Sequence, residues 1–303
     1  MMAKWLLAGL LLATPLSNAA FAEPRQTLGW GRMFDNDAIG DLKDRWHSGS
    51  YTISVVRGPD WAGVLPSKFG EILEYRFWGG TITPANLADP AVDDRRYAAP
   101  LSLGLHTHLD WHGFETSVGA DLVLTGPQTG IGGFQSWLHG MLNVPKPDRS
   151  DQIGNAAYPT LQAEIGRTFV LSDNVTMRPF VAAQAGVETY VRAGGDLVVG
   201  SFGKGSLMLR DDVTGQRYRA VNGDLVPAMS FTLGGDVAKV FDSAYLPSGG
   251  AAVASDTRTR LRAGVQWQGE RASAFYGITY LSPEFDSQSE GQLVGSLNVN
   301  LRF

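Results

Sequence analysis

The stretch Gln292–Phe303, QLVGSLNVNLRF, alternates apolar and polar side chains. Its odd-numbered positions are mostly apolar, from Leu293 to Phe303, and its even-numbered positions include Asn298 and Asn300. A period of two places one set of side chains on each face of a β-strand. In a soluble sandwich the apolar face meets a second sheet, whereas a strand with an aromatic final residue is typical of bacterial outer-membrane barrels, whose apolar face meets lipid. The stretch therefore predicts a strand of a membrane barrel.

The first residues have the pattern of a secretory signal peptide. Lys4 supplies a positive charge, Trp5–Leu16 an apolar stretch, and Ala20-Phe21-Ala22 a small-residue cleavage site. We therefore predict a signal peptide over residues 1–22 and an outer-membrane barrel over residues 23–303. The rest of the sequence has no run of about 18 apolar residues, which a membrane-spanning helix needs. Any embedding in the membrane would then require strands that close into a barrel.

Composition limits the possible classes of function. The 37 glycines and the hydrophobic content of 44% fit strands that face lipid on one side and a polar lumen on the other. The formal net charge of −5 opposes nucleic-acid binding, which requires a basic surface. An anionic ligand would depend on local Arg or Lys side chains or on a bound cation. The absence of cysteine is compatible with an exported protein, but an intracellular protein can also lack cysteine.

Further segments repeat the alternation of the last stretch. Leu101–Trp111 and Phe114–Leu124 form a predicted hairpin around His112-Gly113. Arg260 and Arg262 lie between apolar neighbours, so we expect them to point into a polar lumen. The remaining predicted strands cover residues 28–34, 51–56, 71–78, 161–166, 181–188, 207–210, 228–233, 261–267 and 276–280. Together these segments predict an all-β protein, a transmembrane antiparallel β-barrel of about twelve strands.

One segment, residues 126–159, breaks the strand pattern. Within it Phe134–Leu142 holds Gln135 and His139 one helical turn apart, which predicts a short helix in a loop. A histidine on such a helix is more often structural than catalytic. Asn36-Asp37 and Thr52 are likewise typical of a turn and of a strand when each is considered alone. Catalysis would require these residues to converge in space.

Several short blocks follow one another in a fixed order along the chain. The blocks are Asn36-Asp37, Asp44-Arg45 with Tyr51-Thr52, Thr83-Pro84 with Asp94–Ala98, Gly126-Pro127, Gln135, His139, Asp151-Gln152 with Asn155, and a closing segment from Tyr280 to Phe303. In order and spacing they resemble the outer-membrane lipid A 3′-O-deacylases, over almost the whole mature chain. The resemblance implies a twelve-stranded barrel in the Gram-negative outer membrane, with an active site between the barrel wall and the outer leaflet.

The resemblance also implies a reaction and its residues. The family removes the 3′-linked acyloxyacyl group of lipopolysaccharide lipid A with Ca²⁺. Carried over by position, the functional residues are Asn36, Asp37, Thr52 and His139, with Ser48 and Ser50 as hydroxyls close to Thr52. The implied partners are lipid A in the outer leaflet and the barrel-assembly machinery during biogenesis, and we expect a monomer that binds no nucleic acid.

The chain departs from the family at one position. The acidic residue that the family has six positions after the histidine is Pro145 here. Asp148 or Asp151 would then supply that charge, or the activity would be weaker or altered.

The chemistry of these side chains agrees with an ester hydrolase. A neutral imidazole suits a general base near neutral pH, so His139 would take a proton from water. Asp37 would hold Ca²⁺, which polarises an ester carbonyl, and Asn36 and Thr52 would orient water or the oxyanion. In a rival mechanism Thr52 or Ser48 is the nucleophile. The alternative class is a passive or lipid-binding barrel without catalysis.

We expect deletion of Phe303 to lower the yield of assembled barrel, because the last strand must complete the ring in lipid. Outer-membrane fractions of cells that express the full chain and the deletion variant would be compared by immunoblotting. Equal yield and equal folding would contradict the interpretation of the last stretch.

Overall fold

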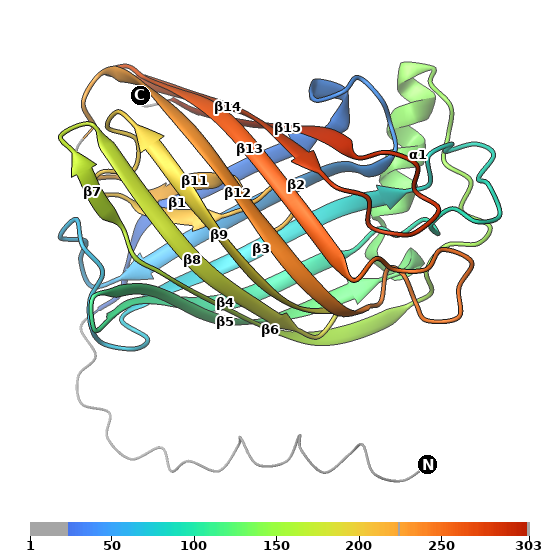
Figure 1. Ribbon diagram of the computed structural model, residues 1–303, viewed down its shortest axis with the longest axis horizontal. Coiled ribbons are helices and arrows are strands. Elements are labelled where there is room, and N and C mark those ends of the chain that lie inside the picture. Colours follow the sequence, from blue (N-terminus) through green and yellow to red (C-terminus); the bar gives the residue numbers. More distant parts are fainter. Residues whose placement is uncertain (1–23, 224, 302–303) are drawn as a thin grey trace, which may run out of the picture.

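The computed structural model describes residues 24–223 and 225–301, which form one closed antiparallel β-barrel (Figure 1). Its twelve wall strands are β1 (Gln26–Asn36), β2 (Trp46–Gly58), β3 (Ile72–Thr83), β4 (Leu101–Trp111), β5 (Phe114–Thr125), β6 (Ala156–Gly166), β8 (Val175–Ala185), β9 (Glu188–Val199), β12 (Ala228–Ser243), β13 (Thr257–Gln268), β14 (Ala272–Leu281) and β15 (Gln292–Leu301). β1 pairs with β15 and β6 pairs with β8, so the ring closes. The short strand β7 (Phe169–Ser172) pairs with β8 alongside the ring. The predicted barrel is confirmed.

The alternation of the strands separates a polar lumen from an apolar outer surface. On β13, Leu261 is 57% exposed, whereas its neighbours Arg260 and Arg262 are each 5% exposed. The arginines therefore point into the lumen, as the sequence predicts. Apolar side chains that are exposed on every second position of a closed barrel are suited to contact with lipid.

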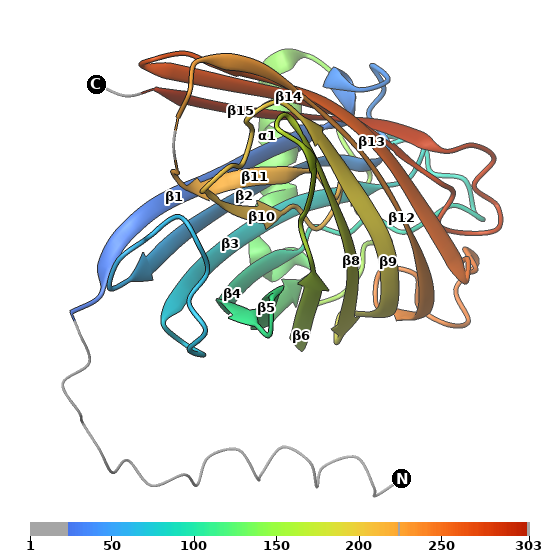
Figure 2. The same cartoon turned by 60° about the vertical axis from the view of Figure 1, so that its left-hand side comes forward.

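A two-stranded hairpin, β10 (Leu207–Arg210) and β11 (Arg217–Val221), lies inside the barrel (Figure 2). It belongs to the connection between β9 and β12 and folds back into the lumen. The prediction that residues 207–210 form a wall strand is wrong, because β10 pairs only with β11. Four residues are also too few to cross a bilayer, which requires about nine in a tilted strand.

Two glycines of β1 allow the hairpin to lie directly against the wall. A Cβ atom on Gly29 would come within 2.1 Å of the carbonyl oxygen of Ala220, and one on Gly31 within 2.7 Å of the Tyr218 ring. Tyr218 is fully buried, and its hydroxyl lies 3.0 Å from Ser54 Oγ of β2. Any larger residue on these two positions would push the hairpin away from β1.

One turn of the wall is not evident from the sequence. The sequence pattern predicts one strand over residues 181–188. In the structure β8 ends at Ala185 and β9 begins at Glu188, with a turn at Gly186-Val187 between them. Gly186 has a φ of +150° and lies so close to Thr160 that a Cβ atom would be 2.4 Å from its Oγ1. The predicted signal peptide and Phe303 lie outside the described residues.

The two ends of the barrel differ in their connections. At one end β4 and β5 join through the tight turn His112-Gly113. At the other end lie the 3₁₀ helix η1 (Asp37–Ile39), the 3₁₀ helix η2 (Pro127–Thr129) and the helix α1 (Ile131–Leu142), together with longer loops (Figure 1). The predicted helix is confirmed and begins three residues earlier than expected. In the described ranges 24–223 and 225–301, no helix is long and apolar enough to cross a membrane.

We expect the luminal hairpin to close the barrel to ions. Replacing residues 201–226 with a short Gly-Ser linker should leave the wall folded, as judged by heat-modifiable migration, and should produce stepwise conductance in planar bilayers. The intact chain should give none. Identical currents from both proteins would show that the hairpin does not block the lumen.

Candidate functional site

The first part of the candidate site is the junction of β1 with η1. Asn36 ends β1 in an extended conformation, and its Oδ1 accepts a hydrogen bond of 2.8 Å from the backbone N–H of Ala38, which starts the 3₁₀ turn. Asp37 follows and is only 1% exposed. Its Oδ2 accepts hydrogen bonds from the Arg45 backbone N–H at 2.7 Å and from Gln292 Nε2 at 3.4 Å.

The carboxylate of Asp37 is incompletely satisfied. Its Oδ1 is buried and has no hydrogen-bond partner. Burial raises the pKa of Asp37 from its ordinary value of 3.8 to about 8; the Arg45 N–H lowers it, and the charges of Asp44 and Asp41 raise it further. An unpartnered carboxylate oxygen of this kind is a suitable ligand for a hard divalent cation. In the part of the chain that the structure describes, no three His, Asp or Glu side chains form a metal-binding group, so carbonyl or amide oxygens would complete such a shell.

Helix α1 lies on the outer surface of the barrel wall at this end. A Cβ atom on Gly79 would lie 3.2 Å from Ile131 Cδ1, and Gly79 shares the outward face of β3 with the exposed residues Tyr75 and Phe77. The buried face of the helix contains Gly132, Gln135 and His139. The exposed side chains are Phe134, Trp137, Met141 and Leu142. The helix therefore presents an apolar surface away from the barrel and polar groups toward the wall.

His139 has a different polar partner at each ring nitrogen. Nδ1 lies 2.7 Å from the backbone carbonyl oxygen of Pro145, and Nε2 lies 3.5 Å from Oδ2 of Asp44. A carbonyl oxygen can only accept, so we assign the proton of the neutral ring to Nδ1. Nε2 then carries the lone pair that a general base needs.

A β-bulge brings Ser48 to the same place. His47 pairs with Ile82 and Gly49 pairs with Thr81, so Ser48 is the extra residue of β2. Its Oγ donates a hydrogen bond to Oδ1 of Asp44. A Cβ atom on Gly49 would lie 2.9 Å from Nδ2 of Asn36, which places the Asn36 amide beside the bulge.

Thr52 does not lie with the other predicted residues. It is fully buried on the luminal face of β2, where its Oγ1 donates to Oδ2 of Asp211 at 3.3 Å. Ser50 also faces the lumen and donates to Asp35. Of the hydroxyls of Ser48, Ser50 and Thr52, that of Ser48 donates to Asp44, the same carboxylate that faces His139.

Asp148 and Asp151, the two acids predicted to compensate for Pro145, have partners other than His139. Asp151 forms an exposed ion pair of 2.8 Å with Arg96, and Asp148 accepts from the backbone N–H of Ser150. The carbonyl of Pro145 and the carboxylate of Asp44 face the imidazole instead. The sequence analysis did not predict that Asp44 contacts His139. The block Asp44-Arg45, which is part of the family resemblance, could have indicated that this residue lies near the site.

Other motif residues anchor the loop that carries α1. Gly126 has a φ of +84°, and a Cβ atom there would lie 2.5 Å from the backbone nitrogen of Asn155. Asn155 Oδ1 accepts from the backbone N–H of Gln128 at 3.0 Å. Tyr97 Oη donates to Gln135 Oε1 at 2.8 Å. These contacts fix the helix and the His139 ring against the wall.

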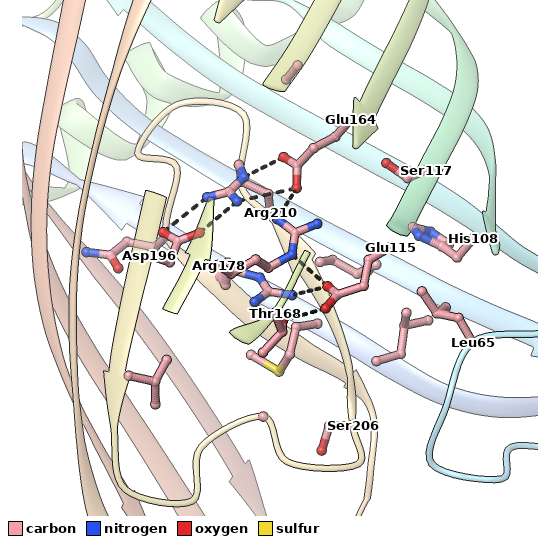
Figure 3. Close-up of a pocket in the computed structure, with 18 of the residues that line it drawn as sticks. Leu65, His108, Glu115, Ser117, Glu164, Thr168, Arg178, Asp196, Ser206 and Arg210 are labelled. Carbon is pink, nitrogen blue, oxygen red and sulfur yellow. Dashed lines mark hydrogen bonds and ion pairs between the residues drawn. The ribbon is translucent and has the colours of Figure 1, made fainter. Parts of the chain in front are cut away.

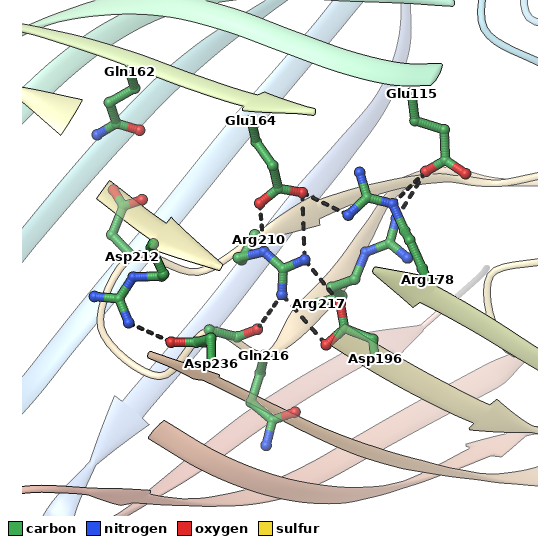
Figure 4. A network of polar contacts seen from close by, with 12 residues as sticks. Glu115, Gln162, Glu164, Arg178, Asp196, Arg210, Asp212, Gln216, Arg217 and Asp236 are labelled. Carbon is green, nitrogen blue, oxygen red and sulfur yellow. Dashed lines mark hydrogen bonds and ion pairs between the residues drawn. The ribbon is translucent and has the colours of Figure 1, made fainter. Parts of the chain in front are cut away.

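A large cavity lies elsewhere, in the lumen, with a volume of about 710 Å³ (Figure 3). Its charged side chains pair with one another: Arg178 bonds to Glu115 at 2.6 Å, and Arg210 bonds to Glu164 at 2.6 Å and to Asp196 at 2.8 Å (Figure 4). None of Asn36, Asp37 or His139 lines this cavity. These ion pairs lie within the lumen, whereas the candidate site is on the outer wall.

Comparisons with known proteins agree with this architecture. A protein-family model described as Outer membrane protein LpxR matches residues 6–303. Among solved structures, LpxR from Salmonella typhimurium has a TM-score of 0.76 and 16% identity and covers 91% of this chain and 100% of that chain. The translocator domain of autotransporter NalP from Neisseria meningitidis is more distant, with a TM-score of 0.43, 14% identity, and 91% and 89% covered. No curated protein matches the sequence.

We expect the stability of the barrel to fall with rising pH because of Asp37. The unfolded chain loses this proton near pH 3.8, whereas the folded chain keeps it to about pH 8. Folding therefore becomes less favourable as the pH rises across that window. At pH 9 and without divalent ions, Asp37→Asn should unfold at a higher temperature than wild type, and at pH 3.5 the two should be equal.

The same experiment contains its control. Added Ca²⁺ should restore the wild type at pH 9 and leave Asp37→Asn unchanged, because only the carboxylate provides the ligand. The midpoint would be measured by heat-modifiable migration. If wild type and variant unfold at the same temperature at pH 9, the buried charge of Asp37 does not destabilise the fold, and the prediction is wrong.

Proposed function

Because this chain belongs to the LpxR family of outer-membrane proteins, we propose that it is a lipid A deacylase that hydrolyses the ester of the 3′-linked acyloxyacyl group of lipopolysaccharide. The protein is an outer-membrane β-barrel. The observation that carries the proposal is the position of His139. Its ring lies between α1 and the outer wall, with Nδ1 held by a carbonyl oxygen and Nε2 open to a reacting proton.

The location of the site suits a substrate that is itself part of the membrane. The exposed aromatic and aliphatic side chains of α1, including Trp137 at 57% exposure, would lie in the acyl region of the outer leaflet. An ester bond of lipid A is at the boundary between acyl chains and sugar. A helix that is apolar on its outer face and polar toward the wall can therefore accept this bond without removing the lipid from the membrane.

The proposed reaction is the attack of water on the ester carbonyl. The water oxygen bonds to the carbonyl carbon while one water proton passes to Nε2 of His139. The tetrahedral intermediate then breaks the bond to the sugar oxygen, which receives that proton from the imidazolium. The products are a carboxylic acid, which retains the water oxygen, and a free sugar hydroxyl.

Two further residues are proposed to support the oxyanion. Asp37 would supply a carboxylate oxygen to a divalent cation, for which its unpartnered Oδ1 is suited, and Ca²⁺ fits an oxygen shell with irregular geometry. Such a cation polarises the ester carbonyl when it is bound. The Asn36 amide lies beside the Ser48 bulge and would donate a hydrogen bond to the oxyanion.

The rival interpretations receive less support. Thr52 cannot act as a nucleophile on the outer wall, because its hydroxyl is directed to Asp211 in the lumen. The hydroxyl of Ser48 donates to Asp44 and not to the histidine. A passive pore is disfavoured because the hairpin β10–β11 and paired charges occupy the barrel interior. Pro145 does not remove the orienting group, since its own carbonyl provides one.

The test is the lipid A of cells that express the chain. Mass spectrometry should show loss of the 3′-linked acyloxyacyl group with wild type. His139→Ala should reduce the cleaved fraction on the order of a hundredfold or more, since general-base catalysis is removed.

His112→Ala is the matched control. His112 lies in the β4–β5 turn at the opposite end of the barrel and should leave activity unchanged. Intact lipid A with wild type would reject the proposed function, and equal cleavage by His139→Ala would reject the role of His139 as the general base.

A further inference from the structure

We propose that Asp44 is a positioning residue of this site: its carboxylate holds the attacking water against Nε2 of His139 and then stabilises the imidazolium. This inference rests on the proposed function and extends it to a residue outside the predicted set. It also explains how the site works with Pro145 in place of an acid.

The geometry around the ring leaves one position for the water. With the proton on Nδ1 bonded to the Pro145 carbonyl, Nε2 has a lone pair, and it faces the carboxylate Oδ2 of Asp44 at 3.5 Å. Two acceptors do not bond to each other, so a donor of two hydrogens belongs between them. A water about 2.8 Å from each atom spans this gap and donates one hydrogen to Nε2 and the other to Oδ2. Its lone pairs then remain free to attack the ester carbon.

The surroundings of Asp44 keep its charge available. The neighbouring guanidinium of Arg45 bonds to Asp41 at 3.1 Å and to Glu290 at 2.5 Å. Asp44 instead accepts a neutral hydrogen bond from Ser48 at Oδ1, which fixes the carboxylate plane and leaves Oδ2 directed at the histidine. The bulge in β2 therefore acts on the histidine through Asp44.

Cationic side chains lie close to α1, whereas the group that faces the histidine ring at Nε2 is a carboxylate. A Cβ atom on the buried Gly132 would be 3.1 Å from Nη1 of Arg149, and one on the exposed Gly140 would be 3.3 Å from Nζ of Lys146. When the water proton passes to Nε2, the new N–H can donate to Asp44 Oδ2, and the carboxylate then faces the positive imidazolium. The proton continues from Nε2 to the leaving sugar oxygen.

The inference is tested by a double-mutant cycle on purified enzyme, with fatty acid release from lipid A in mixed micelles as the readout. Asp44→Asn should lower kcat on the order of tenfold and leave KM unchanged; the loss is smaller than for a buried triad aspartate, because the Asp44 side chain is 43% exposed. In the His139→Ala background, Asp44→Asn should cause no further loss, since its effect acts through the histidine.

Two more variants complete the design. Asp151→Asn removes an exposed carboxylate that is paired with Arg96 and should behave as wild type. Ser48→Ala keeps the charge of Asp44 but removes the hydrogen bond that orients its carboxylate. It should therefore lower kcat by about threefold, again only when His139 is present. Folding of each variant is checked by heat-modifiable migration, and Ser48→Ala supplies the answer if Asp44→Asn does not assemble.

The possible outcomes are distinct. Equal losses with and without His139, or a rise in KM alone, would overturn the role of Asp44 and leave the proposed function in place. Absence of fatty acid release with the wild-type enzyme would instead reject the proposed function itself, and full activity of His139→Ala would reject both the general base and the positioning role of Asp44.

Discussion

Closure of the hydrogen-bonded ring is the constraint on which the rest of the molecule depends. A strand in lipid has no water for its backbone N–H and C=O groups, so every wall strand needs two neighbours. The pairings of β1 with β15 and of β6 with β8 satisfy this requirement at the two places where the chain order alone would leave an edge. Once the ring is closed, the period-two pattern forces polar side chains inward and apolar ones outward.

Many charged side chains point into the lumen, where they pair with opposite charges. Arg178 of β8 pairs with Glu164 of the neighbouring strand β6 and with Glu115 of β5, and the hairpin β10–β11 adds Arg210 to the same network (Figure 4). The hairpin also brings an apolar cluster into the interior, in which Tyr218 and Leu209 pack against Met33 and Val56 of the wall. The interior therefore contains an apolar core beside the 710 Å³ cavity, and this core packs against the wall from inside.

A filled lumen places the chemistry on the outer wall. Two departures from a regular strand surface allow this. Glycines at positions 49 and 79 leave room on the outer face for the Asn36 amide and for α1, and Ser48, the bulged residue, donates its hydroxyl to Asp44. The site that results joins the β1–β2 loop to α1, with His139 between a backbone carbonyl and a carboxylate.

The wall strands could be predicted from the amino-acid pattern, because successive side chains of a barrel strand face lipid and lumen in turn and differ in polarity accordingly. The sequence also indicated the helix with His139 and the turn with Asn36 and Asp37. It failed for residues 207–210, because a luminal strand alternates as a wall strand does, and for Gly186, where one close contact with Thr160 decides the turn. Only the tertiary structure selected Ser48 over Thr52, and only it revealed Asp44 and the Pro145 carbonyl beside His139. The direction of a bulged residue depends on how its strand pairs with the neighbouring strand, which the sequence does not show. Every residue has a backbone carbonyl, so only the folded chain shows which carbonyl lies beside the histidine.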